Sequence, residues 1–389
     1  MSQSARRGVR FLLTLAGILV FLTIIFCFDN KYNTDMPLPQ DGILSLREAD
    51  FTGSSPVFLI DDWQICEGVH RPDEMQDTMR TWVGEFSNYR RYNKDSNKPL
   101  GSATYQLRLR YSGRETLARF YFPELCESYT LWWDGQVLAE GQASAQAAVL
   151  LTEGVHTLTV SITADSGYYA GMYFPGAVGS DAAIMRMVGI QTAVYGAVFL
   201  IPLVLALFCL LLWAQTGDRL RRCFGLFCLS FSLSLCHHFL QLWPNPLSPY
   251  RFLISDLALY AMFYFAVELT LLAAKKEALW FRRPLLLVSC ILPAIEVLLY
   301  FSVPAWSGAA FLHGILQNGY RIFLFACLVF GGIGIWKQDN AVCRRIQCAI
   351  GKLIADTIFG YENSPLHFAM KQAVLWYFVV IVPARFSAF

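Results

Sequence analysis

The sequence predicts an all-β sandwich joined to a membrane-embedded α-helical bundle. An apolar run, Phe11–Phe28, stands alone near the N-terminus. A long polar stretch with strand-like patterns follows it, and from Val188 to Phe389 apolar segments succeed one another almost without interruption. Each of the later runs approaches the roughly 20 residues that a helix needs to cross the hydrocarbon core. We therefore expect one folded domain outside the membrane, attached to a polytopic bundle.

The composition is that of a membrane protein. Hydrophobic residues make up 55% of the chain and charged residues 15%, whereas ordinary soluble domains contain roughly 25% charged residues. The net charge is only +2, and the basic residues form short clusters beside the apolar runs. Membrane lipid is thus an expected partner, and nucleic acid is not.

The basic clusters also predict an orientation, because short cytoplasmic loops are enriched in Lys and Arg. Arginines within residues 1–10 place this tail in the cytoplasm, ahead of the first run. The exit of the run 11–28 offers no small-residue cleavage site, so we expect an uncleaved transmembrane anchor. Residues 29–187 are then the extracytoplasmic sensor domain of a multi-pass cell-membrane protein.

Residues 188–389 form the predicted bundle. Its short loops alternate between loops that contain Lys or Arg and loops that lack them. The segment 344–361 is marginal because Lys352 and Asp356 lie within it, and an amphipathic helix on the inner surface is the alternative. If that segment spans, the bundle has seven spans and a cytoplasmic C-terminus. The expected spans are 188–213, 223–243, 252–273, 285–303, 309–336, the marginal 344–361, and 372–389.

The extracytoplasmic part shows the period-two alternation of strands with one buried face. Asp134-Gly135, a dipeptide that tolerates positive φ, should close a hairpin between two of these strands. Short strands at this spacing, without a convincing amphipathic helix, favour a sandwich of two antiparallel sheets. The expected strands are Tyr105–Tyr111, Ala118–Phe122, Tyr129–Trp133, Val137–Ala139 and His156–Ile162.

The segments 101–110 and 128–137, followed by Gly141, resemble a galactose-binding-like jelly roll. In that family a Tyr-x-Leu-x-Leu strand precedes a strand that ends in Asn/Asp-Gly before the hairpin return. Tyr105–Leu109 and Asp134-Gly135 match these two features.

Together with the polytopic block, the chain resembles the bacterial 7TMR-DISM receptors, which are seven-helix receptors with diverse intracellular signalling modules. The stretch 168–179 is similar to the segment leading from their ectodomain into the first helix. The resemblance implies a signal receptor for an extracytoplasmic small-molecule or carbohydrate ligand. It also implies a cytoplasmic output module, such as the histidine kinase of a two-component system. Because the sequence stops after an apolar run at Phe389, we expect that module to be missing, or supplied by a separate kinase.

A function of another class stays open beside the receptor. A membrane transporter or export component could use the β-domain to capture its substrate, and inverted repeats or broken helices would favour it. No convincing internal repeat is seen. The sequence does not fix the oligomeric state, and a homodimer is kept as one alternative.

No motif predicts catalysis. The chain has no Gly-x-Ser-x-Gly elbow, Walker A loop or His-Glu-x-x-His pattern. The six histidines lack metal-ligand spacing, and His237 and His238 are adjacent and point about 100° apart on a helix. We therefore expect no enzyme, no cofactor and no metal site. A membrane-anchored carbohydrate-active enzyme is the alternative that stays open, because the two acids of a glycosidase need only meet in space.

Aromatic residues are the ligand candidates of the ectodomain, because sugar faces stack on aromatic rings. Trp132 lies on the opposite face of its strand from Trp133, and the alternative for either is a place in the core. Tyr168, Tyr169 and Tyr173 lie in a Gly-rich segment near the membrane. For these three, an interfacial aromatic belt is the alternative.

Ionisable residues at membrane depth are the candidates within the bundle, because unpaired charges there cost several kcal/mol. Arg321 is nearest the middle of its predicted span, and Glu296 on the preceding span could reach it. These residues form either a static pair or a polar switch whose pairing changes when the ectodomain moves. The candidates are Asp256, Glu268, Glu296, His313 and Arg321.

Most of the eleven cysteines lie in or beside predicted spans, where they behave as small apolar residues. Only Cys66 and Cys126 fall in the exported domain. They form either one disulfide bridge, in an oxidising compartment, or two buried thiols.

Overall fold

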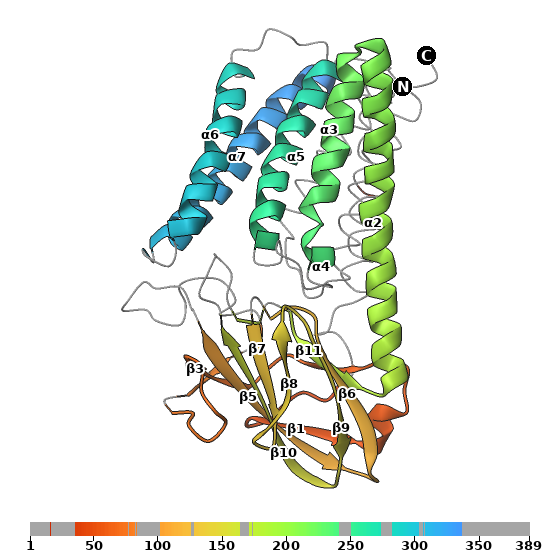
Figure 1. Cartoon of the computed structure of the whole chain (residues 1–389), viewed down its shortest axis with the longest axis vertical. Helices are drawn as coiled ribbons and strands as arrows, with labels where there is room; N and C mark the ends of the chain where they lie inside the picture. The colour runs from red at the N-terminus through yellow and green to blue at the C-terminus, as the bar shows by residue number, and fades with distance from the viewer. Residues whose placement is uncertain are drawn as a thin grey trace.

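The computed structural model contains a β-domain at one end and a set of helices at the other (Figure 1). It describes Ala16 and residues 36–336, with gaps at 77, 82, 84–101, 126–127, 164–170, 173, 241–249, 274–281, 303–305 and 307. The predicted spans 344–361 and 372–389 lie outside the described residues, as does the anchor 11–28 apart from Ala16.

The larger sheet of the β-domain, sheet A, has seven strands in the order β4-β3-β5-β10-β7-β8, with β1 also paired to β5. The ten-residue strand β5 is its centre, because β10 runs along one edge while β3 and β1 share the other. Only the β1–β5 pair is parallel among the described strands. The strands are β1 (Ile43–Arg47), β3 (Trp63–Glu67), β4 (Met79–Thr81), β5 (Ala103–Ser112), β7 (Ser128–Trp133), β8 (Gln136–Gln142) and β10 (Gly154–Thr163).

The smaller sheet, sheet B, has four antiparallel strands in the order β2-β11-β6-β9. Its last strand in sequence, β11, lies beside β6 and leads directly into the helical part. A short 3-10 helix, η2 (Glu48–Phe51), connects the two sheets. The strands of sheet B are β2 (Val57–Leu59), β6 (Thr116–Phe122), β9 (Ala145–Leu151) and β11 (Gly176–Gly179).

The core lies between the two sheets and follows the predicted alternation. On β5, Leu107, Leu109 and Tyr111 are buried, while the arginines between them are exposed. Trp63 is fully buried, and its indole N–H donates to the Leu59 carbonyl oxygen at 3.1 Å. All five predicted strands exist, and the all-β sandwich is confirmed.

The helical part begins earlier than predicted. Helix α2 runs over Asp181–Thr216, so the boundary placed between residues 187 and 188 lies inside a helix. The physical reason is a cap that hydropathy does not register: the Ser180 side chain accepts a hydrogen bond from the backbone N–H of Ala183. The first turns of α2 pack on strands β6 and β11 of the β-domain, where Ile184 contacts Tyr121 and Ala177.

The predicted span 223–243 is also not one helix. Helix α3 covers Arg219–Ser234, and the separate turn α4 covers His237–Leu240. At the break, the Ser234 hydroxyl donates to the Phe231 carbonyl at 2.7 Å, a local bond that competes with helix continuation. A polar residue in an apolar run has thus ended the helix.

The remaining described helices agree with the predicted spans in position. They are α5 (Arg251–Ala273), α6 (Arg282–Ser302) and α7 (Gly308–Trp336). Within the described residues, three helices are long and apolar enough to cross a membrane, namely α2, α5 (over Arg251–Leu269) and α6. A seven-helix bundle is not established, because the described part of the chain contains six α-helices, one of them the four-residue α4.

The hairpin between β7 and β8 shows the expected turn chemistry. Asp134 and Gly135 have φ angles of 48° and 80°, so both occupy the left-handed region that a two-residue hairpin of type I′ requires. The Asp134 carboxylate accepts hydrogen bonds from His156 Nδ1 and from the Thr157 backbone N–H, each at 2.7 Å. One side chain thus ties the turn to strand β10.

This hairpin predicts a pH dependence of stability. Burial lowers the pKa of His156, but its hydrogen bonds to Asp134 and to the Thr152 carbonyl outweigh burial, so that the pKa rises above 6.5. The stability that protonated His156 contributes is full below pH 6.5 and is lost as pH rises through the folded-state pKa. We expect the urea midpoint of the wild-type β-domain to fall between about pH 6 and about pH 8.

The matched variant is Asp134→Asn, because Asn tolerates positive φ while lacking the charge. In this variant the fall in midpoint should shrink. An equal pH response in both proteins would contradict the role assigned to the Asp134–His156 pair.

Candidate functional site

Trp132 lies on the face of sheet A that points away from the core. It is opposite Thr159 in the β7–β10 register, and Thr159 is in turn opposite Gln106 on β5. Residues directly opposite each other project from the same face of a sheet. Because Leu131 and Leu158 point into the core, Trp132 and its neighbours occupy the other side. We call this row, Trp132, Thr159 and Gln106, the polar face.

The polar face is partly covered by the segment 68–72, which crosses it. The Gln106 side-chain amide donates to Thr159 Oγ1 at 3.2 Å and to the Pro72 carbonyl at 3.3 Å. In the neighbouring row, the Ser161 hydroxyl donates to the His70 carbonyl at 2.9 Å, and Thr104 Oγ1 to the Gly68 carbonyl at 2.8 Å. The result is a wall of hydroxyl and amide groups held in fixed orientations.

The Trp132 indole is the polar group on this face that stands out. Its Nε1 is buried and has no hydrogen-bond partner among the described residues, although buried polar groups are nearly always paired. Trp133, by contrast, stacks on His156 with ring centroids 5.0 Å apart and packs against the core. The predicted opposite orientation of the two tryptophans therefore agrees with the structure. Tyr168, Tyr169 and Tyr173 lie outside the described residues.

Cys66 on β3 is a buried free thiol, and it lies opposite Thr104 in the register. Burial raises the pKa of this thiol, and a hydrogen bond with the Thr104 backbone opposes the rise only in part. Cys126 lies outside the described residues. The bridge between the two cysteines stays a prediction.

A second region connects the β-domain to the helices, and we call it the junction. Arg119 on β6 pairs with Asp181 in the first turn of α2, with Nε and Oδ1 2.5 Å apart. Tyr121, two residues along β6, packs with Ile184 in a buried apolar cluster, and its hydroxyl lies 3.5 Å from Gln191 Oε1. Strand β6 thus contacts α2 over two helical turns.

The junction also contains a buried carboxyl, Glu124, which follows β6. Burial raises its pKa to about 7, and the positive charge of Arg251, the first residue of α5, opposes this rise. Burial, together with the charge on Glu124, also raises the pKa of Tyr121. The Oε1 atom of Glu124 has no hydrogen-bond partner among the described residues. One loop of the β-domain is therefore coupled electrostatically to a helix of membrane-spanning length.

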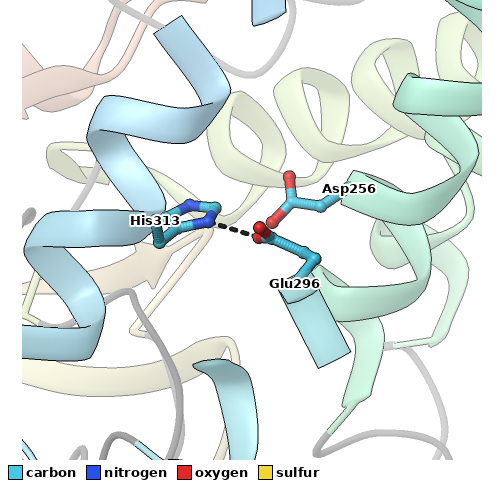
Figure 2. Close-up of side chains that lie close together, drawn as sticks. All are labelled: Asp256, Glu296 and His313. Carbon is cyan, nitrogen blue, oxygen red and sulfur yellow. Dashed lines mark ion pairs between the residues drawn. The ribbon is translucent and has the colours of Figure 1, made fainter. Parts of the chain in front are cut away.

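A third region lies where α5, α6 and α7 approach the β-domain. Figure 2 shows Asp256, Glu296 and His313 with their side chains pointing toward one another. We call these residues the triad. Their ligand atoms all lie within 4.8 Å of one another, and all three residues are buried. His313 Nδ1 forms an ion pair with Glu296.

The predicted pairing of Glu296 with Arg321 is wrong. Glu296 pairs with His313 instead and accepts a hydrogen bond from the Tyr260 hydroxyl at 3.4 Å. Arg321 is exposed, and no ion pair involves it within the described residues. His313 and Arg321 are both on α7 but are eight residues, or about 2.2 turns, apart, so they point in different directions around the helix.

Glu268, another predicted switch residue, lies near the opposite end of α5. It forms an ion pair with Arg282 at the start of α6, with Glu268 Oε2 2.9 Å from the guanidinium. The Tyr264 hydroxyl also donates to it, at 3.3 Å. The five candidates therefore do not form one group: Asp256, Glu296 and His313 meet in the triad, while Glu268 and Arg321 are elsewhere.

Two neighbours of the triad, Gln317 and Tyr260, were not predicted from the sequence. The capacity of the triad to hold a metal ion was not predicted either. The Gln317 amide donates to Asp256 at 3.4 Å, and Tyr260 supports Glu296. The usable signals were the spacings His313–Gln317 and Asp256–Tyr260, each one helical turn, which places both members on one face. Because the ligands come from three helices, no local metal motif could reveal them.

No protein-family model matches the sequence, and a search of curated proteins found no match. Solved structures similar to part of this chain include a β-glucuronidase of Faecalibacterium prausnitzii, with 15% identity over 32% of this chain and 31% of that chain, at a TM-score of 0.27. A GH2 β-galacturonidase from Eisenbergiella tayi has 13% identity over 32% and 24%, at 0.25. A Ruminococcus gnavus β-glucuronidase has 11% identity over 36% and 30%, at 0.27.

The prediction that the chain is not an enzyme is contradicted by these matches, because the matched structures are glycosidases. The chain spans about a third of the length of the first of them, and the TM-scores are too low to assign any reaction to it. Membership of the 7TMR-DISM family is not confirmed. The chain is a β-sandwich domain joined to helices of membrane-spanning length.

The junction predicts a pH-dependent contact between the two parts. The pKa of Glu124 rises from 4.5 to about 7 on folding. The free energy of folding that protonated Glu124 contributes is therefore fully present below pH 4.5 and is lost as pH rises to about 7. At about 1.4 kcal/mol per pKa unit, the loss is roughly 3 kcal/mol. Glu124→Gln should abolish this component. The measurement is hydrogen exchange of the β6 backbone in the full chain at several pH values.

The control variant is Asp61→Asn, because burial also raises the pKa of Asp61, which precedes β3. It should leave the pH response of β6 intact. A wild-type response that persists in Glu124→Gln would contradict the role of Glu124.

Proposed function

We propose that this chain is an integral membrane receptor. Its β-domain binds an extracytoplasmic small molecule of the carbohydrate class on the polar face. Its helices then relay the bound state to a cytoplasmic signalling module or a separate kinase. Residues 29–187 face outward in this proposal, and the N-terminus lies in the cytoplasm.

The observation that supports a ligand at the polar face is the buried, unpaired indole N–H of Trp132. Next to it, Thr159 and Gln106 present a hydroxyl and an amide on adjacent strands. Sugars are bound by such sets, in which an aromatic side chain contacts the ring and a few oriented polar groups bond its hydroxyls. A ligand hydroxyl that accepts from Trp132 would also satisfy its N–H.

The support for a relay is the short connection between strand and helix. Strand β11 ends at Gly179 and α2 begins at Asp181, so Ser180, the N-cap, alone separates them. The Arg119–Asp181 and Tyr121–Ile184 contacts then fix the first turns of α2 on β6. A rearrangement within the sandwich would therefore reach the helices without being absorbed by a flexible linker.

We expect Trp132→Phe to weaken carbohydrate binding by about fivefold, because one ligand hydrogen bond contributes about 1 kcal/mol. The full chain in lipid nanodiscs would be titrated with a panel of neutral and acidic saccharides by calorimetry. Thr159→Val removes the adjacent hydroxyl and should act in the same direction. Trp133→Phe is the matched control on the same strand, since Trp133 faces the core.

Binding that is equal in wild type and Trp132→Phe would contradict the polar face as the site. If no saccharide in the panel binds the wild-type chain, the carbohydrate assignment fails.

The relay predicts that a flexible insertion uncouples the two parts. A Gly-Ser-Gly-Ser insertion between Gly179 and Ser180 should preserve saccharide binding while abolishing the effect of ligand on hydrogen exchange in α5. The same insertion in the loop between β9 and β10, at residues 152–153, is the control and should leave the coupling intact. A ligand effect on α5 that survives the first insertion would exclude α2 as the route.

A further inference from the structure

We propose that the triad of Asp256, Glu296 and His313 binds a divalent transition-metal ion, with Zn²⁺ as the expected metal. This inference concerns a site that is separate from the polar face, and it does not depend on the receptor function. It rests on the ligand types, their mutual distances, their burial and their supporting contacts.

The ligand set is of a kind that transition metals use. One imidazole and two carboxylates can occupy three positions of a Zn²⁺ ion, leaving a fourth for water or another ligand. An imidazole nitrogen favours Zn²⁺ and its transition-metal neighbours over Mg²⁺ and Ca²⁺, which prefer oxygen ligands alone. The triad therefore favours the transition metals.

The distances allow one ion to reach all three groups. Zn²⁺ lies about 2.0–2.2 Å from nitrogen and oxygen ligands, so its ligand atoms are separated by roughly 3–4 Å. In the structure the three ligand atoms lie within 4.8 Å of one another, and the imidazole faces the two carboxyl groups (Figure 2). Binding one ion requires the ligand atoms to approach one another by about 1–2 Å at most.

The burial of the three ligands and their combined charge also favour a divalent metal ion. Glu296 is 0% exposed, His313 1% and Asp256 7%, so the ligands lie inside the bundle. The His313 imidazole is neutral when it ligates a metal, so a proton held in its ion pair with Glu296 would be released on binding. The ligand set then carries two negative charges, which one divalent ion balances. Such balance matters at this depth, because uncompensated charge within a membrane-spanning segment is costly.

Supporting hydrogen bonds hold two of the ligands in place, as is usual around bound metals. The Gln317 side-chain amide donates to Asp256 Oδ1 at 3.4 Å, and the Tyr260 hydroxyl donates to Glu296 Oε2 at 3.4 Å. The Tyr260 backbone carbonyl in turn accepts from the Tyr320 hydroxyl at 3.3 Å. These contacts come from the same helices as the ligands and leave the facing atoms directed inward.

The triad lies near the ends of three helices. Asp256 is five residues from the start of α5, Glu296 six from the end of α6, and His313 five from the start of α7. At 1.5 Å per residue, each ligand lies about 8–9 Å from the helix end that faces the β-domain. A bound ion would join three helices there, and would fix α5 close to Arg251.

The test is metal binding by the full chain in nanodiscs, purified without a histidine tag and stripped with a chelator. We expect about one Zn²⁺ per chain by mass spectrometry of the eluted metal, and a rise in melting temperature on adding ZnCl₂. Asp256→Asn, Glu296→Gln and His313→Ala should each weaken binding by more than about 100-fold. Tyr260→Phe, which removes a supporting bond, should weaken it by about tenfold.

Glu268→Gln is the matched control, because Glu268 is also a buried carboxylate in an ion pair on α5 but lies outside the triad. It should retain full metal binding. Binding that is lost in the triad variants but retained in this control excludes adventitious binding by cysteines. If a triad variant does not fold, the visible absorption of Co²⁺ on the wild-type chain still decides, because nitrogen and oxygen ligands give a spectrum without sulfur charge-transfer bands. No binding by the wild type, binding equal in triad variants and control, or a thiolate spectrum would overturn the proposal.

Discussion

The requirement that buried charge be compensated sets the arrangement of the helical part. Glu268 and Arg282 join α5 to α6 near one end, and the triad joins α5, α6 and α7 near the other. The junction follows the same rule, because Arg251 lies within the electrostatic reach of Glu124. Apolar packing between helices in lipid is weakly directional, whereas each of these polar contacts accepts only one alignment of its helices.

Much of the sandwich could be predicted because its rules are local. The alternation of apolar and polar residues on β5 predicted which of its faces is buried. Asp134-Gly135 predicted the hairpin, because these two residue types tolerate the positive φ that its turn requires. The same alternation placed Trp132 and Trp133 on opposite faces. The row formed by Trp132, Thr159 and Gln106 was beyond prediction, because it depends on the register of three strands that are distant in the sequence.

The helical part shows where hydropathy stops being informative. Apolar runs located α5, α6 and α7, yet they could not reveal the Ser180 cap that starts α2 early or the break after Ser234. Hydropathy also says nothing about helix rotation. The sequence favoured Arg321 as the partner of Glu296, whereas the rotation of α7 places His313 against it. Intramembrane charges can thus be identified from sequence more easily than their partners.

Helix α2 has 36 residues, which corresponds to about 54 Å at 1.5 Å per residue, whereas the hydrocarbon core is roughly 30 Å thick. The excess is long enough for the first turns of the helix to pack on the β-domain while the rest still exceeds the thickness of a hydrocarbon core. Such a rod acts as a lever arm: a tilt of about 3° at the base displaces the tip by nearly 3 Å, given that length. A displacement of that size is comparable to the helix shifts that switch other proteins.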